Sequence, residues 1–460
     1  MLNRVQKRNL TKRDYVTLSS MIFALFFGAG NLIFPLHLGQ LAGGHWGTAA
    51  VGFLVTAVLL PLLSVLAVCV TKSKGVYDIG KPLGATFAVV FMVLIHFTIG
   101  PFFGTPRTAT VSFTVGLAPF FPAKYQSLAL LLFSAAFFGL AYYLSVEQSK
   151  IMARVGKLLN PLFLLLLVAI FAVAFSSPLA HAGSTSATAA YRTAGFTNGF
   201  LQGYNTMDAL AGLALGVTIV TAVNFMGQTD PNKAAWVTAR AGFFSMAFEG
   251  LIYVLLILLG AQSLGQFKLS DNGGVAFDQI VNHYMGSVGQ AILAVLIITT
   301  CLTTAIGLVA AFAQDFHKHF GFLSYKAWLR ITCLASFLTA NVGLNQIIAW
   351  STPVLMFLYP LAMALIFLSI LSPLFHKSSV VYVWVVVVPA VFDMVAAFPA
   401  VVSQSAFGQA MAHVQSFLPL ASSGMDWLVP ALVGAVFGAA HYLLLQRAKA
   451  SAGMEVPMKR

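Results

Sequence analysis

The sequence Phe26-Phe27-Gly28-Ala29-Gly30-Asn31-Leu32-Ile33-Phe34-Pro35 lies in an apolar stretch that is long enough to cross a membrane as a helix. Its glycines, asparagine and proline lower the free-energy cost of unwinding that helix. Inside lipid, a backbone can leave the helix only where it is buried in protein or lines a cavity. The stretch therefore predicts a broken helix whose freed amides and carbonyls face a binding site. A glycine packing patch with a proline kink is the alternative interpretation.

The composition predicts a membrane protein. Of the 460 residues, 59% are hydrophobic and 8% are charged, whereas roughly a quarter of the residues in a soluble protein are charged. Most of the surface is therefore expected to face the lipid bilayer. The net charge of +13 does not indicate a nucleic-acid partner, because the basic residues are scattered over short loops and form no compact basic domain.

The apolar stretches predict an all-α polytopic membrane protein with about twelve transmembrane helices in a single transmembrane domain. The connecting loops are too short for an independent domain. The two longest, 176–203 and 261–288, are candidates for gate or lid elements. The predicted spans are 15–41, 46–70, 84–104, 126–146, 155–175, 204–226, 235–260, 289–313, 326–342, 345–371, 379–402 and 427–446.

Basic residues predict the orientation of the chain. When the N-terminus is placed in the cytoplasm, all but four of the 25 Lys and Arg residues fall on the cytoplasmic side; the exceptions are Arg107, Lys124, Arg192 and Lys268. Cytoplasmic loops of membrane proteins carry an excess of basic residues. The asymmetry therefore supports an even number of spans, with both termini in the cytoplasm.

The sixth span contains a second candidate break. Tyr204-Asn205-Thr206-Met207-Asp208-Ala209-Leu210-Ala211-Gly212 places an acidic residue among polar and small ones, and paired interrupted spans indicate a binding site in transporters. Spans one and six correspond if the first ten spans form two five-helix repeats, although no sequence similarity between the halves is visible. Alternatively, Asp208 lies in a solvated loop at the membrane surface.

The eighth span contains a row of hydroxyl residues. Thr300, Thr303 and Thr304 share one helix face by their spacing. Hydroxyl oxygens opposite freed carbonyls would suit a sodium ion. Alternatively, these hydroxyls bond to carbonyls of their own helix.

Ionisable residues in the spans are functional candidates, because a charge in lipid is costly. Glu249 is a candidate for ion coupling and His96 for a proton relay. A hydrogen-bonded structural role is the alternative for each, and we favour it for Asp393 and His96. Arg107 is expected to extend to the outer interface or to contact a gate.

Four segments carry a resemblance to a known family. They are 23–35 around the first break, Gly100-Pro101 with Thr105-Pro106-Arg107-Thr108-Ala109, Thr206-Met207-Asp208, and Thr304-Ala305-Ile306-Gly307-Leu308. These segments resemble the branched-chain amino-acid:cation symporter family of bacteria, and the resemblance extends along nearly the whole chain.

That family is similar in turn to the wider amino-acid/sodium symporters, which are built as five-plus-five inverted repeats with broken helices 1 and 6. The resemblance implies a first repeat at about 15–175 and a second at about 204–371. It also implies two extra C-terminal helices at about 379–446.

The resemblance further implies which residues bind ligands. The Gly-x-Gly-Asn…Phe-Pro pattern of the wider fold is matched by 28–35, where amides would hold the substrate carboxylate. Ala211-Gly212-Leu213-Ala214 stands where that fold often has hydroxyls, which argues against a second sodium site and suits an aliphatic substrate. The implied substrate-binding residues are Phe26, Gly28, Ala29, Gly30, Asn31, Met207, Asp208, Ala211 and Gly212. The implied sodium ligands are the carbonyls of Ala24, Phe27 and Thr300 and the hydroxyls of Thr303 and Thr304.

These features predict a secondary transporter and not an enzyme. We expect symport of leucine, isoleucine and valine with sodium as the coupling ion, without a cofactor, in a bacterial inner membrane. A proton-coupled transporter that uses Asp208, Glu249 or His96 is one alternative, and a non-transporting amino-acid sensor is another. A membrane enzyme or channel is disfavoured, because no paired catalytic motif or repeated filter loop is visible. The oligomeric state and the preferred substrate are left open.

Overall fold

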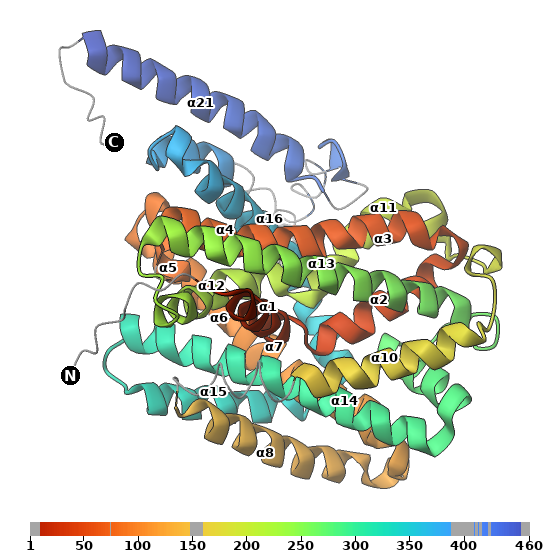
Figure 1. Ribbon diagram of the computed structural model, residues 1–460. Coiled ribbons are helices and arrows are strands. Elements are labelled where there is room, and N and C mark those ends of the chain that lie inside the picture. The colour runs from red at the N-terminus through yellow and green to blue at the C-terminus, as the bar shows by residue number, and fades with distance from the viewer. Residues whose placement is uncertain are drawn as a thin grey trace. The chain divides into compact units, whose positions relative to one another are not determined.

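The computed structural model describes residues 10–73, 75–147, 160–387, 409, 413, 416–421 and 425–451. Throughout this part of the chain the regular structure is helical (Figure 1). The chain divides into two compact units: unit 1 comprises 1–69 and 94–352, and unit 2 comprises 70–93 and 353–460. The predicted all-α class is confirmed.

The first span is broken at the predicted position. Helix α1 (Lys12–Phe26) begins at Thr11, whose hydroxyl accepts from the Asp14 amide while the Asp14 carboxylate accepts from Thr11. The helix ends because the backbone becomes extended at Phe27 and Gly28. It resumes as α2 (Ala29–Ala42), within which Pro35 is accommodated.

Where the structure describes the predicted spans, their residues are mostly helical; residues 155–159 of the fifth span and 388–402 of the eleventh lie outside the described residues. After α2, the main elements in chain order are α3 (Trp46–Leu54), η2 (Val55–Leu59), α4 (Leu60–Thr71), α6 (Ala85–Phe97), η4 (Thr98–Phe102), α7 (Gly104–Gly116), α8 (Gln126–Ser145), α10 (Asn160–Ser176), α11 (Ala189–Gly203), η9 (Tyr204–Thr206), α12 (Asp208–Phe225), α13 (Pro231–Ser263), α14 (Gly273–His319), α15 (Tyr325–Ala340) and α16 (Leu344–Leu371).

The sixth span differs from its predicted limits. Its first half is α11, which lies inside the segment 176–203 that was predicted to be a loop. The break is short: it spans η9 and Met207, whose backbone is left-handed with φ 64°. Helix α12 then begins at Asp208, so Ala211 and Gly212 are helical and not part of the break. Polar residues in α11 hide it from a hydropathy argument, whereas packing against other helices stabilises it.

The third span extends beyond its predicted end, and the eighth is preceded by a helical segment that was not predicted. The third continues past 104 through α7, after an interruption at Gly100 and Pro101. Helix α14 begins at Gly273, but its backbone is non-helical at Gly286 (φ 56°), so a separate helical segment over 273–285 lies in the predicted loop 261–288 and the eighth span follows the kink, close to its predicted start at 289. In α7 the polar residues Thr105, Arg107 and Thr108 are buried by neighbouring helices, whereas Asn282, His283 and Ser287 before the eighth span are exposed.

Close helix contacts at glycines hold the frame of unit 1 together. Helices α3 and α11 lie side by side (Figure 1), and a Cβ on Gly199 would be only 2.0 Å from the carbonyl oxygen of Ala49. Helices α2 and α13 pack in the same way, because a Cβ on Gly39 would be 2.0 Å from the carbonyl oxygen of Ile257. Such backbone approach is a common solution in membranes, where small residues let helices pack closely.

Unit 2 has its own helix packing. Helix α17 (Ser379–Tyr382) and η11 (Val383–Val387) pack against α21 (Leu428–Ser451), and Gly434 allows the backbones to approach at Trp384. The rest of the predicted span 379–402, including Asp393, lies outside the described residues.

In the described part of the chain, seven helical stretches are long and apolar enough to cross a membrane, or up to eight if α12 counts as one bent span. Halves of broken spans fall below that length, and Ala29–Thr71 joins two predicted spans across the turn at Gly43. The chain is thus a multi-pass membrane protein, whereas the count of twelve spans stays a prediction.

We predict that Gly199→Ala destabilises the protein by about 1–3 kcal/mol, because its new methyl group would overlap the Ala49 carbonyl. Gly139→Ala on α8 is the control, because nothing lies within 4 Å of its Cβ. Thermal unfolding of both variants in detergent should show a lower midpoint for Gly199→Ala alone. Equal midpoints would contradict the close α3–α11 contact.

Candidate functional site

A small cavity lies at the breaks of the first and sixth spans. All of the predicted substrate-binding residues except Gly212 line it. The enclosed volume is about 30 Å³, which holds no more than a few water molecules. The complete lining is Leu25, Phe26, Gly28, Ala29, Gly30, Asn31, Ile99, Gly104, Arg107, Thr108, Thr206, Met207, Asp208, Ala211, Thr304 and Leu308.

Two helix N-termini reach this cavity. Helix α2 begins at Ala29 and helix α12 at Asp208, and both first residues line the cavity wall. The first amides of a helix have no acceptor within it and carry partial positive charge, so they can bind an anion. The Gly28 amide is already used, because it donates to the Asn31 side-chain carbonyl at 2.9 Å. The amides of Ala29 and Gly30 are therefore better placed to receive a carboxylate than that of Gly28.

The side chain of Asn31 joins the first break to two acidic residues. Its amide nitrogen donates to an Asp208 carboxylate oxygen at 2.7 Å and to Glu249 Oε1 at 3.0 Å. It also lies within hydrogen-bonding distance of the Tyr253 hydroxyl. That hydroxyl donates to Glu249 Oε1 at 2.6 Å and approaches the same Asp208 oxygen at 3.2 Å. We call Asn31, Asp208, Glu249 and Tyr253 the carboxyl cluster.

The carboxyl cluster is deeply buried. Asp208 is 3% exposed and Glu249 is fully buried, and Glu249 Oε2 has no hydrogen-bond partner among the described residues. Asp208 therefore does not lie in a solvated surface loop. Two ionised carboxylates sharing the same neutral donors would repel each other in a medium of low dielectric constant. The arrangement favours a positive charge, or a proton, near the pair.

Arg107 provides a positive charge close to Asp208. It is 3% exposed, so the expectation that it extends to the outer interface is wrong. Its guanidinium donates to the Asn205 carbonyl at 2.5 Å, lies over the Phe34 ring at 5.2 Å, and acts electrostatically on Asp208. Arg107 thus connects α7 to the sixth-span break and places a fixed positive charge on the cavity wall.

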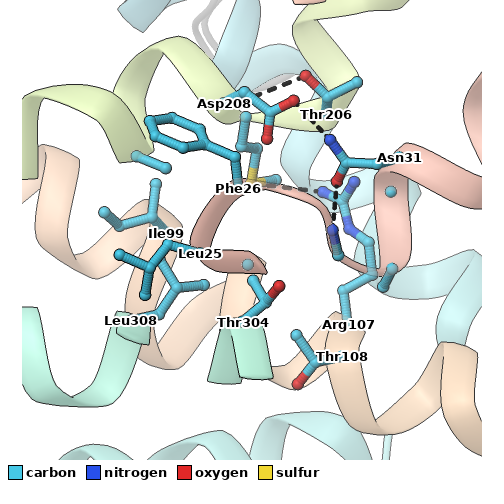
Figure 2. Close-up of a pocket in the computed structure, with 16 residues that line it drawn as sticks. Leu25, Phe26, Asn31, Ile99, Arg107, Thr108, Thr206, Asp208, Thr304 and Leu308 are labelled. Carbon is cyan, nitrogen blue, oxygen red and sulfur yellow. Dashed lines mark hydrogen bonds between the residues drawn. The ribbon is translucent and has the colours of Figure 1, made fainter. Parts of the chain in front are cut away.

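Apolar side chains occupy a separate part of the cavity wall. In Figure 2, Leu25, Ile99 and Leu308 lie on one side of the segment that joins α1 to α2, and Arg107 lies on the other. The cavity therefore has an aliphatic side and a charged side. This division suits a ligand with an aliphatic group at one end and charged groups at the other.

The predicted sodium ligands are only partly brought together. The Thr304 hydroxyl lines the cavity and is 3.3 Å from the carbonyl oxygen of Phe27, in the first break. The Thr303 hydroxyl instead donates to the carbonyl of Thr300 at 2.7 Å. The Thr300 hydroxyl is buried without a partner among the described residues, and Ala24 is buried in the last turns of α1.

Two other candidates lie away from the cavity lining. Gly212 faces α4, where a Cβ would be 1.8 Å from the Ser64 hydroxyl oxygen, so it serves close packing. His96 Nε2 is 2.8 Å from an Asp315 carboxylate oxygen, and its ring meets the edges of Phe312 and Phe316. The hydrogen-bonded structural role that we favour for His96 therefore has a specific partner, Asp315.

Sequence reasoning missed Arg107 as a cavity residue and Tyr253 as a partner of the acids. The signal for Arg107 was its place in a Thr-Pro-Arg-Thr segment beside Gly100-Pro101, which was assigned to a loop. For Tyr253, the signal is its position four residues after Glu249, which puts both on one face of α13.

The sequence is similar to those of known amino acid transport proteins. A family profile described as "Branched-chain amino acid transport protein" matches residues 11–444. The branched-chain amino acid permease BrnQ of Lactobacillus delbrueckii subsp. lactis is 40% identical and covers 93% of this chain and 96% of that protein. Permease BraB of Bacillus subtilis is 38% identical, covering 94% and 96%. Permease BrnQ of Escherichia coli is 38% identical, covering 92% and 94%.

The fold also has a relative among solved structures. The crystal structure of MhsT in complex with L-phenylalanine aligns with a TM-score of 0.58 over 93% of this chain and 99% of that one, at 14% identity. At such low identity the alignment establishes a shared fold and nothing about ligands.

We predict that Asn31→Ala lowers the stability by about 1–3 kcal/mol or more, because it leaves buried carboxyl oxygens without a donor. Asn198→Ala is the control, because that side chain bonds only to carbonyls of its own helix near the surface. Thermal unfolding in detergent should separate the two variants. A smaller loss for Asn31→Ala than for Asn198→Ala would mean that the cluster does not stabilise the break.

Proposed function

This chain belongs to the family of branched-chain amino acid transport proteins, and we propose that it imports leucine, isoleucine and valine by symport with sodium. The observation that carries the proposal is the cavity at two helix breaks, with an aliphatic side and a charged side. Relatives named as branched-chain amino acid permeases at 38–40% identity support the substrate class.

The cavity residues suggest how a zwitterionic amino acid would bind. The carboxylate would be held by the amides of Ala29 and Gly30 and by the guanidinium of Arg107, and the ammonium group by Asp208. The aliphatic side chain would lie among Leu25, Ile99 and Leu308, with Ala211 leaving room for a branch. Phe26, Gly28, Asn31 and Met207 complete the proposed site.

Sodium would bind beside the first break. The carbonyl of Phe27 and the hydroxyl of Thr304 are neutral oxygens of the kind that hard cations prefer. The carbonyl of Ala24, the hydroxyl of Thr303 and the carbonyl of Thr300 would complete the ligands after Thr303 releases its bond to Thr300. The negative end of α1, at its C-terminus, adds a favourable field.

Amino acid and sodium transport would be coupled because both ligands bind to the same closed conformation. The cavity of about 30 Å³ is too small for a branched amino acid, so the walls must open for substrate to enter. If amino acid and sodium together stabilise one conformation of the breaks, the sodium gradient drives uptake by alternating access. We further propose the twelve-span, five-plus-five repeat architecture and cytoplasmic termini in a bacterial inner membrane.

Uptake of labelled leucine into proteoliposomes tests this function. We expect an inward sodium gradient to drive uptake, with valine and isoleucine competing. Thr304→Val should lower the apparent sodium affinity at least about tenfold, because it removes an oxygen ligand of the ion. The control is Thr299→Val on the same helix, whose hydroxyl bonds to the Val295 carbonyl. Uptake that ignores sodium would overturn the coupling ion, and failure of branched amino acids to compete would overturn the substrate class.

The carboxyl cluster favours proton coupling as a second candidate. Two buried carboxyls share neutral donors, and Glu249 Oε2 is without a partner among the described residues, so Glu249 can hold a proton. Release of that proton toward the cytoplasm would accompany release of the amino acid.

Glu249→Gln separates the two ions, because glutamine keeps the shape but cannot release a proton. If protons drive transport, uptake driven by a pH gradient should disappear while exchange of internal for external leucine persists. Asp278→Asn is the control, since its carboxylate bonds to Gln290 away from the cavity. Sodium-driven uptake that survives Glu249→Gln would exclude this residue as the coupling site.

A further inference from the structure

A second, larger cavity lies between α1, α10 and α13. Its volume is about 790 Å³, within the range of roughly 300–1,000 Å³ that is usual for small-molecule sites. We call it the α1–α13 groove; its lining includes Lys12, Tyr15, Phe23, Arg240, Phe244 and Phe248. It shares no residue with the lining of the substrate cavity.

Two basic residues stand on the lining of this groove. The guanidinium of Arg240 lies 5.3 Å from the centre of the Tyr15 ring and 5.8 Å from that of Trp236, so cation–π contacts orient it. Within the described part of the chain, the side chains of Arg240 and Lys12 make no hydrogen bond or ion pair. Nor is any described lining residue acidic. An oriented guanidinium with free donors matches the geometry of a phosphate group.

The remaining wall of the groove is mostly apolar, apart from Ser19, Ser20 and Ser245, and part of its aromatic surface is exposed. Phe244 and Phe248 are 55% and 41% exposed, and Trp236 beside Arg240 is 64% exposed. A cationic end followed by an apolar wall is complementary to a lipid, which carries a charged headgroup and acyl chains. This end of the bundle is the one that the charge pattern predicts to be cytoplasmic, where basic residues meet anionic lipids.

We propose that the α1–α13 groove binds one anionic phospholipid. Its phosphate lies against Arg240 and Lys12, and an acyl chain lies along Phe244, Phe248 and Phe23.

The position of the groove gives the bound lipid a route to the first break. Phe23 contacts Phe248 at 5.4 Å between ring centres and stacks on Phe27 at 4.9 Å. Phe27 provides the carbonyl that accepts from Thr304. A lipid packed against Phe23 therefore contacts the helix half that ends at the first break, beside the substrate cavity.

The test is lipid retention by the full-length protein. The protein is placed in nanodiscs made of equal parts of phosphatidylcholine and phosphatidylglycerol, released, and examined by native mass spectrometry to count bound lipids of each class. We expect preferential retention of phosphatidylglycerol. Arg240→Gln should reduce it roughly fivefold, the ratio that corresponds to about 1 kcal/mol per basic residue near anionic lipid. Arg240→Lys should retain part of the binding.

A matched control and a second variant make the result decisive. Lys124 also lies over an aromatic ring, that of Tyr125 at 5.5 Å, but is outside the groove; Lys124→Gln should leave retention unchanged. Lys12→Gln, at an exposed helix start, reduces retention without a change inside the bundle.

Three outcomes would overturn the proposal. One is equal phosphatidylglycerol retention in the wild type, Arg240→Gln and Lys12→Gln. Another is an equal loss in Lys124→Gln. The third is displacement of the lipid by inorganic phosphate, which would assign the groove to a soluble anion.

Discussion

The Asn31 side chain makes hydrogen bonds to polar groups that the break in the first helix would otherwise leave without partners. Its carbonyl accepts the Gly28 amide, and its nitrogen reaches the acidic side chains of α12 and α13. A backbone that leaves the helix inside a membrane needs such partners, since each unsatisfied group there is costly. The break, the position of α12 and the protonation of the acids are therefore coupled through one amide. A change at any of these elements must be transmitted to the others.

Close backbone contacts at glycines hold together the helix pairs that surround this coupled region. Where α3 meets α11 and α2 meets α13, the backbones themselves are in contact, so these pairs can move only as rigid bodies. The first break separates α1 from the tightly packed α2 by only Phe27 and Gly28. The segment that joins the two halves of the first span is therefore short and lies next to the cavity.

The local features of the fold could be predicted from sequence, whereas the distant contacts could not. The first break was located because its glycines, Asn31 and Pro35 are adjacent in the chain. In the carboxyl cluster, Asn31 is separated from its three partners by 177 to 222 positions, and no local pattern connects it to them. Hydropathy does not predict helix α11 because its polar residues, of which Arg192 and Thr193 are exposed, lower its apolar content, whereas its close packing on α3 is a tertiary contact. Arg107 was assigned to a loop because a lone charge usually marks a span end, and only burial against η9 overrides that expectation.

The left-handed Met207 makes the two helix breaks energetically unequal. Gly28 adopts an extended conformation with φ −130°, whereas Met207 holds φ 64° at a conformational cost of about 1–2 kcal/mol. Relaxation of Met207 to helical angles would join η9 and α12 into one straight helix, and the bond from Arg107 to Asn205 opposes this. The backbone of the sixth span therefore carries a conformational cost at Met207 that the extended Gly28 does not add to the first break. A relative with glycine at this position would hold the same left-handed backbone without that cost.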